Sequence, residues 1–149
     1  MKLSAINPDI ALAEYLDCKI DVNTSATDKF AMRVYAQTEQ PRDGLGTEYV
    51  KVVYNGLVTS ATYPISIVSG NLALMIYSKT MPNGVAKNKR IAQICDDVIE
   101  RINGKCIGGY YFETDITNII TPTTTSVTTG YAVLVLNVLW HTTNDKHNG

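Results

Sequence analysis

Two stretches of the chain carry apolar residues at steps of three and four, the spacing of one face of an α-helix. The first follows Asn7-Pro8, a good N-cap and a residue suited to the first helical position, and its apolar residues are Ile10, Ala13, Leu16 and Ile20. The second runs from Val85 to Asn103 before Gly104, and its apolar residues are Ile91, Ile94, Cys95, Val98 and Ile102. The pattern predicts two helices, the second of them long.

Shorter segments carry the alternation or the apolar runs that are typical of β-strands. We expect strands at Phe30–Gln37, Glu48–Tyr54, Tyr63–Val68, Leu72–Ser78, Ile107–Glu113 and Tyr131–His141. Both faces of the segment Leu72–Ser78 are largely apolar. This predicts a central place in a sheet, with cover on both sides.

Residues that favour turns separate these segments. Asn55-Gly56 predicts a hairpin, and Ser69-Gly70-Asn71 predicts a turn. The polar stretch Thr38–Gly46, with one proline and two glycines, predicts an exposed loop. Thr121–Thr129, with Pro122 and six threonines, predicts a loop or a mobile arm between the last two strands.

The order of helix, strands, long helix and two further strands predicts an α+β fold. We expect a two-layer arrangement, in which a mostly antiparallel β-sheet has two helices packed on one face. The 149 residues favour a single domain spanning 1–149. Isoleucine, valine and threonine make up 44 residues, and such branched side chains suit a sheet.

Charge and composition exclude several classes of protein. Charged residues are 18% of the chain and the net charge is −1, which excludes a histone-like coat and an acidic tail. The longest apolar run, Tyr131–Leu136, is shorter than the roughly 20 residues of a membrane helix. Asn7-Pro8-Asp9 interrupts any signal-peptide core. We expect a protein made in the cytoplasm, without a membrane partner.

Candidate reactive groups are few. The three cysteines, Cys18, Cys95 and Cys106, are an odd number without close pairs, so we expect no disulfide framework and no zinc site. If the last two strands pair, His141 could face Cys106 as a thiolate–imidazole pair; the alternative is a small strand residue and a surface histidine. We expect no enzyme, no cofactor and no metal site.

A basic cluster lies around the start of the long helix. Lys79, Lys87, Lys89 and Arg90 occur with no acidic residue between the first and the last of them. Cations oppose the helix dipole at this end. The cluster is either a solvated helix start or a contact for an anionic surface, such as an acidic subunit or passing nucleic acid.

The segments Leu72–Lys79, Ile91–Ile99, Tyr110–Phe112 and Gly130–Trp140 together resemble tailed-bacteriophage neck proteins, the tail-terminator and head–tail joining (tail completion) family. The similarity covers about Tyr63 to Thr142 in the order of elements. It implies a non-enzymatic virion subunit that forms a homo-oligomeric ring at the portal-to-tail junction. Such a ring caps or completes the tail, meets other neck, portal and tail proteins, and surrounds the DNA.

The resemblance also implies contact residues. They are Glu39, Arg42 and Asp43 in the first loop, Thr123–Thr128, including Thr124 and Thr125, in the second, and Lys87, Lys89 and Arg90 toward the lumen or an acidic partner. The alternative for each loop is plain solvation. Alternative functions are a portal-proximal adaptor, a minor capsid protein, or a domain that binds a small ligand or nucleic acid. The N-terminal third matches no pattern of the family.

Overall fold

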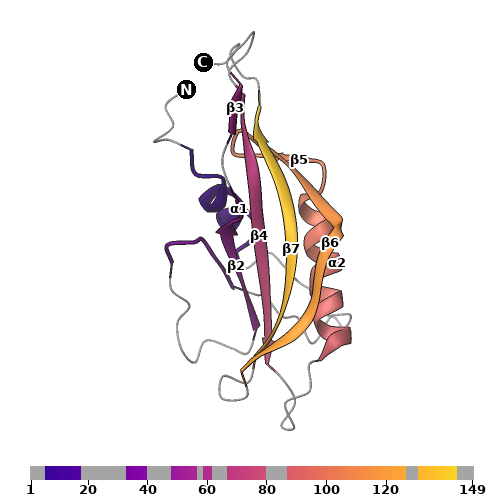
Figure 1. Cartoon of the computed structure of the whole chain (residues 1–149). Helices are drawn as coiled ribbons and strands as arrows, with labels where there is room; N and C mark the ends of the chain where they lie inside the picture. Colours follow the sequence, from indigo (N-terminus) through magenta and orange to yellow (C-terminus); the bar gives the residue numbers. More distant parts are fainter. Residues whose placement is uncertain are drawn as a thin grey trace.

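The computed structural model describes residues 6–17, 33–39, 48–56, 59–61, 67–79, 87–126 and 131–143 (Figure 1). Its helices are α1 (Pro8–Leu16) and α2 (Asn88–Ile102). Its strands are β1 (Arg33–Tyr35), β2 (Glu48–Tyr54), β3 (Thr59–Ala61), β4 (Ile67–Lys79), β5 (Lys105–Ile107), β6 (Tyr110–Ser126) and β7 (Tyr131–Thr142).

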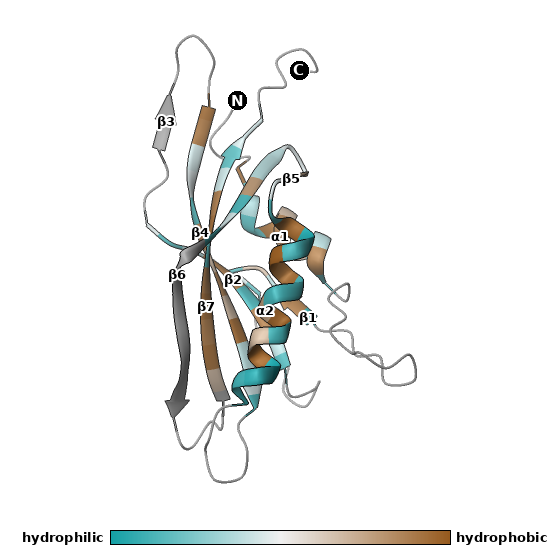
Figure 2. Cartoon of the chain, turned by 90° about the vertical axis from the view of Figure 1, so that its right-hand side faces the viewer, coloured by the Kyte–Doolittle hydropathy of each residue, from teal (hydrophilic) through white to brown (hydrophobic). Residues whose placement is uncertain are grey.

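All seven strands belong to one curled sheet, with the order β1-β2-β4-β7-β6-β5 and with β3 beside β4. Only β1 and β2 are parallel; the other described pairs are antiparallel. Both helices lie on the same side of the sheet (Figure 2). The expected α+β fold, with a mostly antiparallel sheet and two helices on one face, is confirmed.

The core lies between the helices and the face of the sheet that they cover, which we call the inner face. The inner face consists of alternate strand residues, among them Val50, Val52, Leu72, Leu74, Ile76, Leu134, Leu136, Val138 and Trp140. All five apolar residues predicted for the second helix are buried here. Of the described helices, none is long and apolar enough to cross a membrane.

Helix α1 contacts both margins of the curled sheet, because it packs against β1 and β2 and also against β5. Hydrogen bonds hold it there. The Asn7 N–H donates to the Tyr110 hydroxyl at 2.9 Å, and the Asp9 carboxylate accepts from the Tyr54 hydroxyl at 2.9 Å. Asp9 is only 4% exposed, so its side chain joins helix to sheet inside the fold.

Strand β4 runs straight through Ser69-Gly70-Asn71, so the predicted turn is wrong. Gly70 pairs with Trp140 on β7, and the indole ring lies against it. A Cβ atom at Gly70 would lie 3.0 Å from the ring. The glycine therefore marks close packing inside a strand, which a sequence pattern does not distinguish from a turn.

Asn55-Gly56 does not close a hairpin either. Strand β2 pairs with Leu72–Ser78 and β3 pairs with residues 67–69, so both follow the same edge of β4. The Asn55 N–H donates to the Asn71 carbonyl at 3.0 Å, and Gly56 has a φ of 90°. The dipeptide therefore follows β2 where β2 and β3, which lie in line along the same edge of β4, are interrupted. Of the predicted strand Tyr63–Val68, residues 63–66 lie outside the described residues, and the last two begin β4.

The last third of the chain contains more strand than predicted. The expected strand Ile107–Glu113 is a hairpin, in which Gly108 and Gly109, with φ of 60° and 85°, join β5 to β6. The expected loop at 121–129 is wrong over 121–126, which belongs to β6. Its threonines suit a strand, and three register shifts against β7 accommodate the irregular segment. Residues 127–129 lie outside the described residues.

The remaining boundaries agree to different extents. Strand β1 covers residues 33–35 of the predicted strand Phe30–Gln37, of which residues 30–32 lie outside the described residues. Helix α1 ends at Leu16, and Ile10, predicted on its apolar face, is exposed. Strand β2 has the predicted bounds, and β7 extends one residue beyond its predicted end. Helix α2 begins at Asn88, with Lys87 as its N-cap. Strand β4 is central, as predicted, but the described elements cover only one of its faces.

Candidate functional site: the outer face of the sheet

The face opposite the helices, here called the outer face, is the candidate site. Its side chains come from the strand positions that alternate with the core. They are Arg33, Tyr35, Tyr49, Lys51, Val53, Ile67, Ser69, Asn71, Ala73, Met75, Tyr77, Lys79, Cys106, Tyr111, Glu113, Asp115, Val133, Val135, Asn137, Leu139 and His141. No described helix or strand lies over them. More than half of these residues are apolar or aromatic, which is unusual for a sheet face that water covers.

Three tyrosines on adjacent strands order one end of this face. The Tyr49 and Tyr77 rings are stacked, with centroids 4.5 Å apart and an interplanar angle of 15°. Tyr35 meets Tyr49 edge to face at 5.9 Å. Burial by these neighbours raises the pKa of Tyr77. Such pairs stabilise each other without a second layer, so this part of the outer face is ordered in a single copy.

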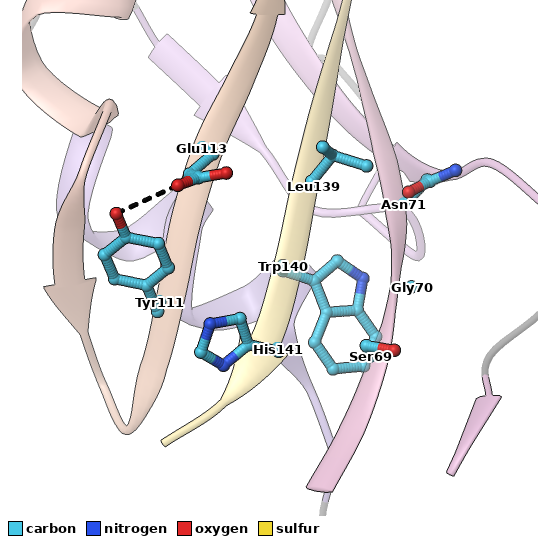
Figure 3. A pocket seen from close by; sticks show the side chains of 8 residues that line it. All are labelled: Ser69, Gly70, Asn71, Tyr111, Glu113, Leu139, Trp140 and His141. Atoms are coloured by element: carbon cyan, nitrogen blue, oxygen red, sulfur yellow. Dashed lines mark hydrogen bonds between the residues drawn. The ribbon is translucent and has the colours of Figure 1, made fainter. Parts of the chain in front are cut away.

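The other end of the outer face is hollowed (Figure 3). The cavity has a volume of about 420 Å³ and is lined by Ser69, Gly70, Asn71, Tyr111, Glu113, Leu139, Trp140 and His141. The Tyr111 hydroxyl donates a hydrogen bond to Glu113 Oε1 at 3.1 Å. This bond to a carboxylate raises the pKa of Tyr111, so the phenol stays a neutral donor.

His141 is oriented by the backbone next to it. Its Nδ1 lies 2.9 Å from the Thr142 carbonyl oxygen. A carbonyl only accepts, so this geometry assigns a ring proton to Nδ1. The ring lies beside that of Tyr111, with centroids 5.1 Å apart.

The predicted possibility that Cys106 faces His141 does not hold. Cys106 pairs with Tyr111, and Tyr111 pairs with His141, so the three residues form one row across β5, β6 and β7. Two strand spacings, about 9.6 Å, separate the first from the last. Tyr111 stands between thiol and imidazole, and Cys106 is the exposed strand residue of the alternative interpretation.

The other candidate reactive groups are structural. Cys95 is buried in the core, as predicted, and burial raises its pKa to about 11. Asp97 pairs with Arg101 on the next turn of α2 at 2.7 Å. Among the described residues, no group of three histidine, cysteine or acidic side chains is placed to hold a metal ion.

The structure divides the predicted basic cluster into two parts. Arg90 reaches back to β2, where its Nη2 lies 3.0 Å from Glu48 Oε1 and its Nε donates to Glu48 Oε2 at 3.0 Å. Ser78 on β4 donates to the same carboxylate at 3.1 Å. Glu48 is only 8% exposed, so this clamp anchors the start of α2 inside the fold. Lys87 and Lys89 are exposed.

Sequence reasoning missed the partner of Arg90, which lies 42 residues away. A signal was available: the first turn of α2 holds no acidic residue to balance its cations. The balancing carboxylate therefore comes from another element.

The loop residues predicted as contacts lie in different parts of the fold. Glu39 is exposed, and its Oε1 accepts from the Ala36 N–H at 2.8 Å, closing a turn after β1. Arg42 and Asp43 lie outside the described residues. Thr124 pairs with Ala132, so it and Thr125 belong to strand β6 and not to a loop. The described members of this set belong to separate elements of the fold.

The sequence was compared with protein-family models and with curated protein sequences. No protein-family model and no curated protein sequence matches the chain. The candidate site therefore rests on the geometry of the outer face and its cavity.

Proposed function

We propose that this protein is a structural subunit of the neck of a tailed bacteriophage. Copies of it form a ring at the portal-to-tail junction, which completes or caps the tail and surrounds the DNA channel. The proposal joins the resemblance in the order of elements to one observation on the structure. That observation is an ordered, largely apolar sheet face on which no described element packs.

The chemistry of the outer face fits contact with another protein. Leu139 is 42% exposed, and the pair Met75 and Val135, four residues further along the same face, is half-buried. Tyrosine and methionine are enriched in protein interfaces because they offer a large apolar surface that tolerates partial wetting. Burying this face between copies would remove apolar surface from water, at about 25 cal/mol for each Å².

The edge of β6 that faces away from β7 is a second surface suited to contact with another copy. Strand β5 pairs only with residues 110–112, and Asn103 Oδ1 accepts from the Thr114 N–H at 3.0 Å. Beyond Thr114, no described strand pairs with this edge of β6. Residues 116–130 contain no charged side chain, whereas proteins usually protect an open edge with charges. Contacts through two different surfaces close into rings when the rotation between copies allows it.

The mass of the purified chain under native conditions tests the proposal. We expect assemblies several times the 16.3 kDa of one copy, seen by native mass spectrometry and as rings with an open centre in electron micrographs. We also expect them to bind purified phage tails. A chain that stays monomeric at all concentrations and ignores neck components would contradict the proposal. A ring that binds portals and not tails would favour the adaptor function instead.

A pair of matched variants links the test to the outer face. Leu139→Gln should lower the assembled fraction, because it replaces an exposed apolar side chain on that face. Ile10→Gln changes an equally exposed apolar residue, 39% exposed, on α1 and should leave assembly unchanged. Equal assembly of both variants would remove the outer face from the proposal.

A further inference from the structure

The cavity and the start of α2 have complementary chemistry. We propose that the cavity formed by Tyr111, Glu113 and His141 binds the ammonium group of Lys87 or Lys89 from a neighbouring copy. The inference rests on the proposed ring and adds to it the two surfaces that meet.

The walls of the cavity suit a lysine side chain. Glu113 is exposed, and Tyr111 occupies one of its oxygens, so the carboxylate keeps acceptor sites for an ammonium group. The ring of Tyr111 offers the negative face that attracts cations. The exposed side chain of Leu139 can cover the aliphatic stem of a lysine.

The charge of the cavity points the same way. Its described lining contains one carboxylate, that of Glu113, and no lysine or arginine. The Tyr111 hydroxyl donates a hydrogen bond to Glu113 and carries no positive charge. The described lining therefore offers a carboxylate but no lysine or arginine to pair with it.

The start of α2 offers the missing cations. Lys87 and Lys89 are exposed, and neither forms an ion pair in the described part of the chain. Their charges oppose the dipole at the N-terminal end of the helix, and no ion pair with a described residue compensates them. Arg90 differs, because Glu48 satisfies it internally. A carboxylate from another copy would compensate the two lysines.

The two surfaces lie at opposite ends of one copy. The clamp of Arg90, Glu48 and Ser78 fixes the start of α2 beside one end of β4, whereas Ser69 lines the cavity near the other end (Figure 1). Nine strand residues separate the two ends, a span of about 30 Å. The lysines therefore reach a cavity only in another copy. Such head-to-tail contact uses two different patches, the arrangement that generates rings.

Charge reversal with rescue tests the pairing. Glu113→Lys alone, or Lys87→Glu with Lys89→Glu, should weaken assembly by about ten- to a hundredfold, as for the loss of a charge-assisted contact. Combining all three changes should restore most of it. The readout is the assembled fraction by native mass spectrometry across a dilution series, with circular dichroism to show that each variant is folded.

Matched controls separate pairing from net charge. Glu100→Lys changes an exposed acid on α2, and Lys105→Glu changes an exposed lysine on β5. Both should assemble like the unmodified protein. A ring that forms normally with Glu113→Lys would overturn the inference and leave the proposed function standing. An unmodified chain that never assembles would overturn both. Lysine variants that assemble normally but lose DNA would show that the lysines face DNA, against the inference.

Discussion

The two faces of the sheet are built from the same strands, yet they behave differently. On β4, Leu72, Leu74 and Ile76 are fully buried beneath the helices. Their neighbours Met75 and Tyr77 point the other way and keep part of their surface exposed. An apolar strand position therefore shows that a side chain avoids water, but not whether the same chain or another copy covers it.

The faces are also ordered by different means. The inner face is held by burial and by connections between elements, such as the Arg90–Glu48 clamp. The outer face is held by contacts between neighbouring strands, such as the stacked rings of Tyr49 and Tyr77. Changes on the inner face should therefore alter the stability of one copy. Changes on the outer face should alter association between copies.

The largest expected effect is a difference in the free energy of unfolding between variants of two leucines, one on each face. Leu74→Ala removes a fully buried side chain and should lower the free energy of unfolding by about 2–5 kcal/mol, because the packed core cannot close the cavity. Leu139→Ala, on the outer face, should cost less than about 1 kcal/mol. Urea unfolding at equal protein concentration measures both. Similar losses for the two variants would contradict the distinction between the faces.

The clamp at the start of α2 should come next. Glu48→Gln leaves Arg90 half-buried without its carboxylate and should cost about 1.5–3 kcal/mol. Arg33→Gln breaks the more exposed pair with Asp17, in which Arg33 is 47% exposed, and should cost less than about 1 kcal/mol. The same urea experiment compares them. A larger loss for Arg33→Gln would reverse the interpretation.

A smaller effect is expected where β4 passes under Trp140. Gly70→Ala places a Cβ atom 3.0 Å from the indole ring and should destabilise the protein by about 1–2 kcal/mol through overpacking. Trp140→Phe in the same chain should recover part of the loss that Gly70→Ala causes. A full thermodynamic cycle of melting temperatures measures this coupling. Additive losses would contradict the close packing.

The smallest effect is a dependence on pH. Burial, with the hydrogen bond to Asp9, raises the pKa of Tyr54 well above its usual range. The folded chain then holds this proton more tightly than the unfolded chain. The resulting stability is complete below the ordinary tyrosine pKa of about 10 and is lost as the pH rises from there through the raised value. Tyr54→Phe should show a shallower loss of stability above pH 10 in urea titrations. Identical slopes would contradict it.

Local patterns predicted the elements whose environment is uniform along their length. Strand β2 alternates regularly, and α2 has a continuous apolar stripe, so both were predicted closely. The errors arose where a distant contact decides the conformation. Gly70 is read as a turn unless Trp140 is known to lie against it, and the threonines around Pro122 are read as a loop unless β7 is known to pair with them.

The candidate site was less accessible to sequence reasoning. The cavity appears only when β6, β7 and β4 pair in their observed registers, which bring Tyr111, His141 and Ser69 into one row. No single segment of the sequence carries that information. The basic residues at the start of α2 were recognised, but the division between clamped Arg90 and the exposed lysines depends on Glu48. The contact roles of Glu39, Arg42, Asp43, Thr124 and Thr125 remain predictions.

Helix α1 contacts both margins of the sheet, and these contacts hold the two margins in place relative to each other. The nine-residue helix connects the two margins: Asp9 is hydrogen-bonded to Tyr54 on β2, and the preceding Asn7 is hydrogen-bonded to Tyr110 on β6. Gly108 of the last hairpin lies so close that a Cβ atom there would be 3.1 Å from that of Ala11. Helix α1 thus connects strands at both margins of the curled sheet. If copies of the protein form a ring, this short helix helps to determine how many copies complete the ring.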